Sequence, residues 1–232
     1  MKKQISIVIP TYNERNNIVP LCNKIATSLN GKYKYEVIFV DDNSPDQTYE
    51  EINNVMTQYP MIHLIRREGK LGLGSAVKEG FNKASGDYWI MMDADLSHDP
   101  IYLPDMIKAL DNNDIVIGSR HVKGGGVKNW PFYRKFISSV ASYIARLILT
   151  VPVKDITSGF AGFRKEILEK GLSQLTPKGF KILVEIIVNV KHAKIKEIPI
   201  VFVDRQYGKS KLSIKEIILF LLLCIRLRKI NG

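Results

Sequence analysis

The sequence predicts an α/β protein whose single domain has a mostly parallel central sheet with helices on both faces. Residues 4–119 alternate short apolar, β-rich runs with stretches of helical periodicity, as βαβ units do. The length of 232 residues suits one large domain, and no repeat or low-complexity linker divides the chain. A composition of 45% hydrophobic and 25% charged residues excludes a disordered chain, collagen and a disulfide-stabilised miniprotein.

The first half is expected to contain five strands and four helices. Strands are predicted where apolar, β-branched or aromatic residues run together, at 4–9, 36–40, 61–65, 88–92 and 114–118. Helices are predicted between them, at 16–29, 46–58, 74–84 and 99–110. Asp99 followed by Pro100 is the N-cap and first position expected of the last helix.

The alternation is looser in the second half. We expect a glycine-rich loop at 121–129, helices at 134–149 and 181–191, an irregular segment at 155–163, a strand at 195–203 and a closing helix at 213–229. The longest apolar run, 217–225, is far shorter than the roughly 20 residues that span a bilayer, so no transmembrane segment is predicted. Cys22 and Cys224 lie in apolar surroundings, which favours two reduced thiols in a reducing compartment.

Positive charge is concentrated in two segments. Residues 120–135 hold five basic and no acidic residues, and residues 205–232 hold seven basic residues and one acidic residue. Because these segments account for the whole net charge of +11, the rest of the chain is neutral. Specific anionic ligands would explain this pattern. Solvated basic loops with no ligand would explain it equally well.

Polar clusters follow three of the predicted strands, at 10–14, 41–46 and 93–95. Ligands of open α/β sheets bind beyond the carboxyl ends of the strands. Asp93 and Asp95 are two residues apart in an extended segment, so both carboxylates project to the same side. Their repulsion is relieved by a cation, and oxygen ligands favour Mg²⁺ or Mn²⁺ held together with a diphosphate. The chain has no P-loop, no Gly-x-Ser-x-Gly motif and no histidines at metal-ligand spacing.

Eight motifs together resemble the signature of family-two glycosyltransferases. Four are Pro-Thr-Tyr-Asn-Glu at 10–14, Val-Asp-Asp-Asn-Ser-Pro-Asp at 40–46, Gly-Lys-Leu-Gly-Leu-Gly at 69–74 and Met-Asp-Ala-Asp-Leu-Ser-His at 92–98. The others are Gly-Ser-Arg at 118–120, Gly-Gly-Gly-Val at 124–127, Ser-Gly-Phe at 158–160 and Phe-Val-Asp-Arg-Gln-Tyr-Gly-Lys-Ser-Lys at 202–211. The resemblance implies a GT-A type, Rossmann-like fold over 1–212, with a nucleotide-sugar half (1–119) and an acceptor half (120–212). It leaves 213–232 as a basic and apolar C-terminal helix, a candidate membrane-docking element.

The resemblance also implies roles for individual residues. The nucleotide-sugar site would comprise Pro10, Tyr12, Glu14, Val40, Asp42, Asp93, Ala94, Asp95, Arg120, Arg205 and Lys211. Asp95, Arg205 and Lys211 would be catalytic, and Arg134 and Ser138 would bind the acceptor phosphate. Asp93 and Asp95 would bind Mg²⁺ or Mn²⁺. Some members place a metal-binding Gln where this chain has Ser97, whose hydroxyl is the expected third ligand.

The resemblance implies inverting, metal-dependent transfer of mannose from GDP-mannose to dolichyl or another polyprenyl phosphate. A phosphate acceptor is already ionised at neutral pH and needs no base, which suits residues 115–160, where Asp155 is the only carboxylate. The expected location is the cytoplasmic face of a membrane, bound peripherally, with the membrane surface and a separate membrane subunit as candidate partners. A UDP-sugar (glucose-type) transferase remains an alternative. So does a non-catalytic basic membrane- or nucleic-acid-binding protein, although no nucleic-acid-binding motif is found and no nucleic-acid partner is expected.

Overall fold

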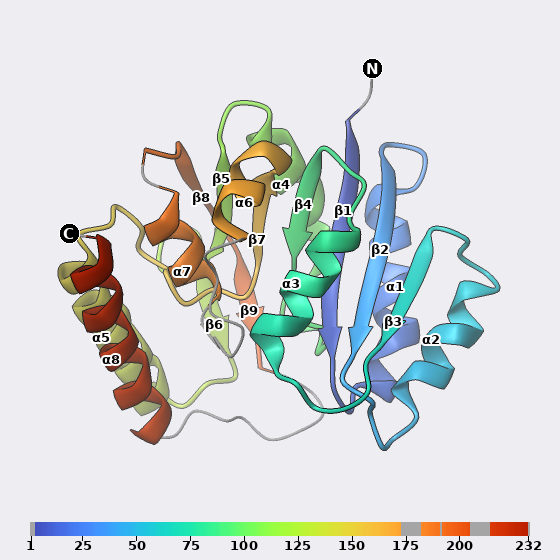
Figure 1. The fold of residues 1–232 in the computed structure, drawn as a ribbon, viewed down its shortest axis with the longest axis horizontal. Coiled ribbons are helices and arrows are strands. Elements are labelled where there is room, and N and C mark those ends of the chain that lie inside the picture. The colour runs from blue at the N-terminus through green and yellow to red at the C-terminus, as the bar shows by residue number, and fades with distance from the viewer. Residues whose placement is uncertain (1–2, 173–181, 191, 205–213, 232) are drawn as a thin grey trace.

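The computed structural model describes residues 3–172, 182–190, 192–204 and 214–231 (Figure 1). Its main sheet has seven strands in the order β3-β2-β1-β4-β7-β5-β8. Their bounds are β1 Gln4–Thr11, β2 Lys34–Asp41, β3 Ile62–Arg66, β4 Tyr88–Met91, β5 Ile115–Ser119, β7 Ala161–Arg164 and β8 Ile195–Pro199. A second, two-stranded parallel sheet joins β6 (Gly126–Lys128) to β9 (Val201–Val203).

All neighbours in the main sheet are parallel except β7, which runs antiparallel between β4 and β5. The carboxyl ends of β1, β2 and β4 therefore meet at one edge of the sheet, the lower edge in Figure 1. This is the edge at which the sequence predicts the ligand site. The mostly parallel sheet expected from the alternating pattern is confirmed.

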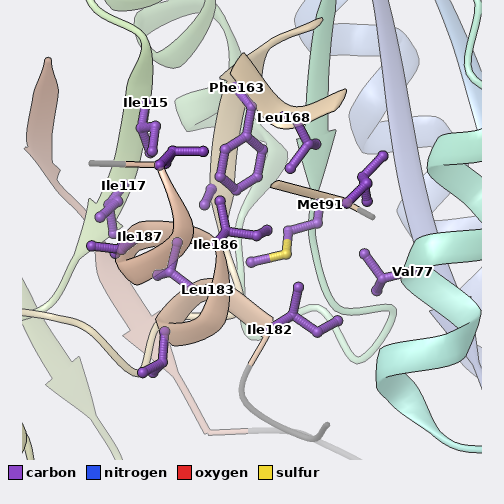
Figure 2. Close-up of a cluster of buried hydrophobic side chains, with 14 of the residues drawn as sticks. Val77, Met91, Ile115, Ile117, Phe163, Leu168, Ile182, Leu183, Ile186 and Ile187 are labelled. Atoms are coloured by element: carbon purple, nitrogen blue, oxygen red, sulfur yellow. The ribbon is translucent and has the colours of Figure 1, made fainter. Parts of the chain in front are cut away.

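Helices cover both faces of the sheet (Figure 1). On one face lie α1 (Arg15–Leu29), α2 (Thr48–Met56), a 3₁₀ turn (Pro100–Tyr102) and α4 (Leu103–Leu110), and on the other lie α3 (Leu73–Lys83), α6 (Lys165–Leu172) and α7 (Ile182–Asn189). The alternation of β1 places Ile5, Ile7 and Ile9 on the first face and Val8 on the second. Figure 2 shows how α7 inserts apolar side chains, including Leu183 and Ile186, against the strands.

Helices α5 (Phe132–Leu149) and α8 (Ile214–Asn231) lie side by side at one end of the molecule (Figure 1). Phe220, Cys224 and Leu227 of α8 are buried, whereas the other sides of the two helices expose large apolar residues. We call this surface the α5–α8 apolar face; it comprises Ile137, Val140, Tyr143, Leu147, Ile218, Leu219, Leu222 and Ile225. Within the described ranges, none of the helices combines the length and hydropathy needed to cross a bilayer.

The second half of the chain departs from the sequence prediction in four places. The segment expected to be irregular, 155–163, runs into β7 at Ala161, in the middle of the sheet. The single strand expected at 195–203 is divided at Ile200. Its backbone N–H still donates to Ser119 O of β5 at 3.0 Å, whereas its carbonyl accepts from the N–H of Gly126 in β6 at 3.0 Å, so the chain passes from one sheet to the other between β8 and β9. The glycine-rich loop contains β6, and α6 was not predicted. The short strands β6, β7 and β9 are defined by pairing with distant segments of the chain.

Candidate active site

A cavity of about 140 Å³ opens at the carboxyl edge of the sheet. Its walls come from both halves of the chain: Pro10, Leu73 and Asp93 from the first half, and Thr157, Ser158 and Gly159 from the second. The structure thus brings together Pro10 and Asp93, which the sequence predicts as site residues. It also adds Ser158 and Gly159 of the Ser-Gly-Phe segment to the same site.

The two aspartates that end β2 have different surroundings. Asp41 is fully buried and accepts hydrogen bonds from the hydroxyls of Thr11 (2.9 Å) and Ser44 (2.6 Å), so it ties the ends of β1 and β2 together. Asp42, predicted to bind the nucleoside, accepts from Arg67 Nη1 at 2.6 Å and from the backbone N–H of Gly72 at 2.9 Å. Each oxygen retains a second lone pair for a ligand donor.

Arg67 was not identified by sequence reasoning. Its side chain is only 3% exposed, and besides Asp42 it contacts Glu79 (3.2 Å) and donates to the Ser75 hydroxyl (2.5 Å). The guanidinium thereby fixes the 67–72 loop and the start of α3 around Asp42. The local sequence, Arg66-Arg67-Glu68 at the end of β3, gives no sign that one of the arginines is buried.

The other predicted nucleoside-binding residues, Tyr12, Glu14 and Val40, have different surroundings. The Lys70 ammonium lies 4.0 Å from the centroid of the Tyr12 ring, a cation–π contact just after the carboxyl end of β1. Glu14 accepts a hydrogen bond from the Asn17 amide at 2.7 Å. The side chain of Val40 is buried in the core, so its contribution to a ligand would come from its backbone.

The Asp93–Ser97 turn carries the predicted metal ligands. The Asp93 side chain is 40% exposed, whereas Asp95 and Ala94 are buried. Asp95 Oδ1 accepts from both the backbone N–H (3.1 Å) and the hydroxyl (2.5 Å) of Ser97. Among the described residues no cluster of three or more His, Cys, Asp or Glu side chains could hold a metal. Two carboxylates still fit a Mg²⁺ or Mn²⁺ ion that completes its shell with diphosphate oxygens and water. In this structure the hydroxyl of Ser97, the predicted third ligand, donates to the Asp95 carboxylate and so helps to orient it.

Arg120, expected to engage the sugar and phosphates, forms a two-point ion pair with Asp155. Its Nε and Nη2 lie 2.7 and 2.6 Å from the carboxylate oxygens, and Nη2 also donates to Thr157 at 2.9 Å. Both side chains are buried. Burial alone would raise the pKa of Asp155, but the Arg120 guanidinium more than offsets it, so the pKa lies below its ordinary value. Asp155 is therefore ionised, and Arg120 presents only its remaining N–H groups to a ligand.

His98 lies beside Asp93, with its Nδ1 atom 3.6 Å from Asp93 Oδ2, and is almost fully buried. Burial lowers the pKa of His98, although the carboxylates of Asp93 and Asp95 act in the opposite direction, so the ring is neutral at pH 7. Its neighbours in the second half are the rings of Phe160 and Phe202. From the sequence, only its proximity to Asp95 was apparent.

Several predicted site residues lie outside the described part of the structure. Arg205 and Lys211 fall in the 205–213 gap. Arg134 belongs to the first turn of α5, as predicted, but its side chain is not among those described. Ser138 is half-buried one turn later in the same helix.

Comparisons with known proteins identify the family. The model of the Glycosyl transferase family 2 matches residues 6–172. The dolichol-phosphate mannosyltransferase of Pyrococcus furiosus is 47% identical over 99% of this chain and 65% of its own length. The dolichol-phosphate mannosyltransferase of Saccharomyces cerevisiae is 38% identical over 95% of this chain and 85% of its own length. The polyprenol monophosphomannose synthase of Mycolicibacterium smegmatis is 35% identical over 89% and 80%, respectively.

Solved structures support the fold. Glucosyl-3-phosphoglycerate synthase from Mycobacterium tuberculosis, in complex with Mn²⁺, UDP and glucosyl-3-phosphoglycerate, superposes with a TM-score of 0.68 at 17% identity, covering 97% of this chain and 78% of that one. The same enzyme with Mg²⁺ and UDP also gives a TM-score of 0.68. The GT-A type fold expected from the sequence is thereby confirmed. The chain belongs to glycosyl transferase family 2.

Proposed function

We propose that this protein transfers mannose from GDP-mannose to dolichyl or another polyprenyl phosphate, with inversion at the anomeric carbon. The observation that carries the proposal is the pair Asp93 and Asp95, placed at the carboxyl edge of the sheet beside a cavity lined by Pro10. Relatives named as mannosyltransferases for dolichol or polyprenol phosphate support the choice of sugar and acceptor. This chain spans 65% of the length of the Pyrococcus furiosus relative.

The donor site would combine two kinds of contact. Asp42, oriented by Arg67, would accept hydrogen bonds from the nucleoside, next to Tyr12. Asp93 and Asp95 would hold Mg²⁺ or Mn²⁺, whose Lewis acidity would neutralise charge on the departing nucleoside diphosphate. Arg205 and Lys211, from the family motif, would place further positive charge against the leaving group.

The acceptor chemistry follows from the state of Asp155. This carboxylate is engaged by Arg120, so it is poorly placed to remove a proton from an acceptor hydroxyl. A phosphomonoester is largely ionised at neutral pH and needs no such base. Its oxygen would attack the anomeric carbon as the bond to the nucleoside diphosphate breaks and the bond electrons leave with the diphosphate. Arg134 and Ser138, near the N-terminus of α5, would bind the acceptor phosphate.

Binding at the cytoplasmic face of a membrane would use the α5–α8 apolar face. Eight large apolar side chains are exposed on these two adjacent helices, more than the single exposed apolar residues expected of an ordinary surface. Arg226, Arg228 and Lys229 at the end of α8 would add attraction to anionic lipid of about 1 kcal/mol each. A separate membrane subunit is a second candidate occupant of this face.

Liposome flotation tests the membrane proposal. Leu222→Glu places a charge on the α5–α8 apolar face, and we expect it to reduce flotation with anionic vesicles by about tenfold, since a buried charge opposes insertion. Ile101→Glu is the matched control, because Ile101 is 66% exposed on the 3₁₀ turn outside this face. Equal flotation of both variants and the unmodified protein would contradict the proposal.

The activity itself is tested with radiolabelled donors. The protein is incubated with Mg²⁺, dolichyl phosphate and either labelled GDP-mannose or labelled UDP-glucose, and the label extracted into organic solvent is counted. Mannose transfer is expected from GDP-mannose. Transfer from UDP-glucose alone would replace the proposal with the glucose-type alternative. No transfer from either donor, together with salt-dependent duplex binding, would favour a non-catalytic basic protein.

A further inference from the structure

The imidazole of His98 lies where the two halves of the domain meet. It stacks on Phe160, with 5.4 Å between ring centroids and 25° between planes. It meets Phe202 of β9 edge-on, at 5.3 Å and 74°. Phe202 in turn contacts Trp130 after the glycine-rich loop, with centroids 5.5 Å apart. A continuous row of rings therefore connects the glycine-rich loop to the turn that carries Asp93 and Asp95.

His98 contacts Asp93 through its Nδ1 atom. The backbone N–H of Asp93 donates to Nδ1 at 3.4 Å, and Nδ1 lies 3.6 Å from Asp93 Oδ2. A nitrogen that accepts a hydrogen bond from an N–H carries no proton of its own, so this contact requires the neutral ring with its proton on Nε2. The contact thus fixes the backbone at Asp93, and the carboxylate lies beside the ring edge.

The other sides of Asp93 are also restricted. A Cβ atom at Gly159 would lie 2.8 Å from Asp93 Oδ2 and 3.2 Å from His98 Cε1. The same turn is held from β9, where the Val203 N–H donates to Ser97 O at 3.3 Å. The carboxylate therefore occupies a slot whose walls come from both halves of the chain.

We propose that His98 is a positioning residue that fixes Asp93 for binding the metal and diphosphate, and that it transmits the placement of Phe160 and Phe202 to that site. The inference rests on the proposed function, because it presumes that Asp93 binds the metal. His98 itself would touch neither substrate nor metal. Its role is to supply an acceptor for the Asp93 N–H from a ring anchored in the second half.

Two variants separate the acceptor from the ring. His98→Asn retains an acceptor, because its Oδ1 replaces Nδ1 on the same Cγ, but loses the aromatic contacts. His98→Phe retains the ring contacts but has no acceptor. Binding of Mn²⁺ is measured by EPR in the presence of GDP, and separately of UDP, and the melting temperature is measured alongside.

We expect Mn²⁺ affinity and melting temperature to rank His98→Phe and His98→Asn in opposite orders. His98→Phe should weaken Mn²⁺ binding by about 10- to 100-fold, the usual effect of losing a partner behind a metal ligand, while keeping the higher melting temperature. His98→Asn should lose less Mn²⁺ affinity than His98→Phe, because it keeps the acceptor, but it should melt earlier because it loses the contacts with Phe160 and Phe202. If Mn²⁺ affinity instead follows the melting temperature in both variants, the role of His98 is structural only and the inference is wrong.

Two further variants test the premise that Asp93 binds the metal and the proposed transmission through the ring. Asp93→Asn tests the premise: if it leaves Mn²⁺ binding unchanged, the proposed metal site fails and the inference with it. If Asp93→Asn abolishes binding but His98→Phe does not weaken it, only the inference fails. Phe202→Leu changes the ring that meets His98 edge-on and that also contacts Trp130. It should weaken Mn²⁺ binding in the unmodified protein but have little further effect in His98→Phe, and additive effects would contradict transmission through the ring.

Discussion

Replacing Gly159 with alanine should impair sugar transfer while preserving the fold. The added Cβ would lie 2.8 Å from Asp93 Oδ2, whereas ordinary contacts begin at 3.4 Å, so the carboxylate must retreat by about 0.6 Å. Because the Asp93 side chain is 40% exposed, it can make this shift at little cost to folding, but the shift moves the predicted metal ligand away from its position. A misplacement of 1 Å at a reacting centre costs about 10²-fold. We therefore expect a loss of roughly 10- to 100-fold in kcat/KM, or about 1.4–2.7 kcal/mol of transition-state stabilisation.

Gly162→Ala is a matched control on the same segment. Its Cβ would meet the side chains of Leu110 (3.0 Å) and Met106 (3.1 Å) in the core, away from Asp93. It should cost about 1–3 kcal/mol of unfolding free energy by overpacking, with little change in Mn²⁺ affinity or in kcat/KM of the folded fraction. Urea unfolding and steady-state transfer assays measure both quantities. If Gly159→Ala is fully active, or if both variants lose activity in proportion to their stability, the reasoning from the Asp93 slot is refuted.

Three further predictions concern charged groups. Asp95→Asn should keep the fold but lose at least about 10²-fold in transfer, as EDTA should in the unmodified protein, because an amide cannot replace the anionic ligand; full activity under both treatments would remove the metal role. Arg134→Ala should severely lower transfer to the lipid phosphate while calorimetry shows unchanged binding of the nucleotide sugar; a collapse of donor binding would assign Arg134 to the donor site instead. Asp155→Asn should cost about 3–5 kcal/mol of unfolding free energy at pH 7, because it leaves Arg120 buried without its partner. Since the pKa of Asp155 is lowered in the folded state, this stabilisation is present above its unfolded pKa of about 3.9 and is lost as pH falls through the folded value, so urea midpoints of the two proteins should converge below about pH 4.

Sequence reasoning succeeded where the signal is local. The strands of the first half are uninterrupted apolar runs, and Asp93 and Asp95 directly follow one of them, so their place at the sheet edge could be predicted. The prediction missed β7. Its four residues, Ala-Gly-Phe-Arg, show no alternation of apolar and polar side chains, because the strand is covered on both faces.

Long-range pairs were equally inaccessible. Arg67 reaches Asp42 across 25 residues, and Arg120 reaches Asp155 across 35. Neither spacing matches a helical or strand period, so no pattern in one sequence marks the partners. Because the sequence does not reveal that Asp155 is its partner, Arg120 was expected to bind the nucleotide sugar. The structure shows that most of its donors are already occupied.

The central position of β7 has a consequence for biosynthesis. During synthesis β4 is complete at Met91, but its neighbour on that side begins only at Ala161, about 70 residues later. At translation rates of about 5–20 residues per second, the edge of β4 is left unpaired on the ribosome for about 4–14 s. An apolar edge strand is a template for pairing with another chain. We therefore expect the nascent first half to be prone to aggregation until β7 pairs with β4.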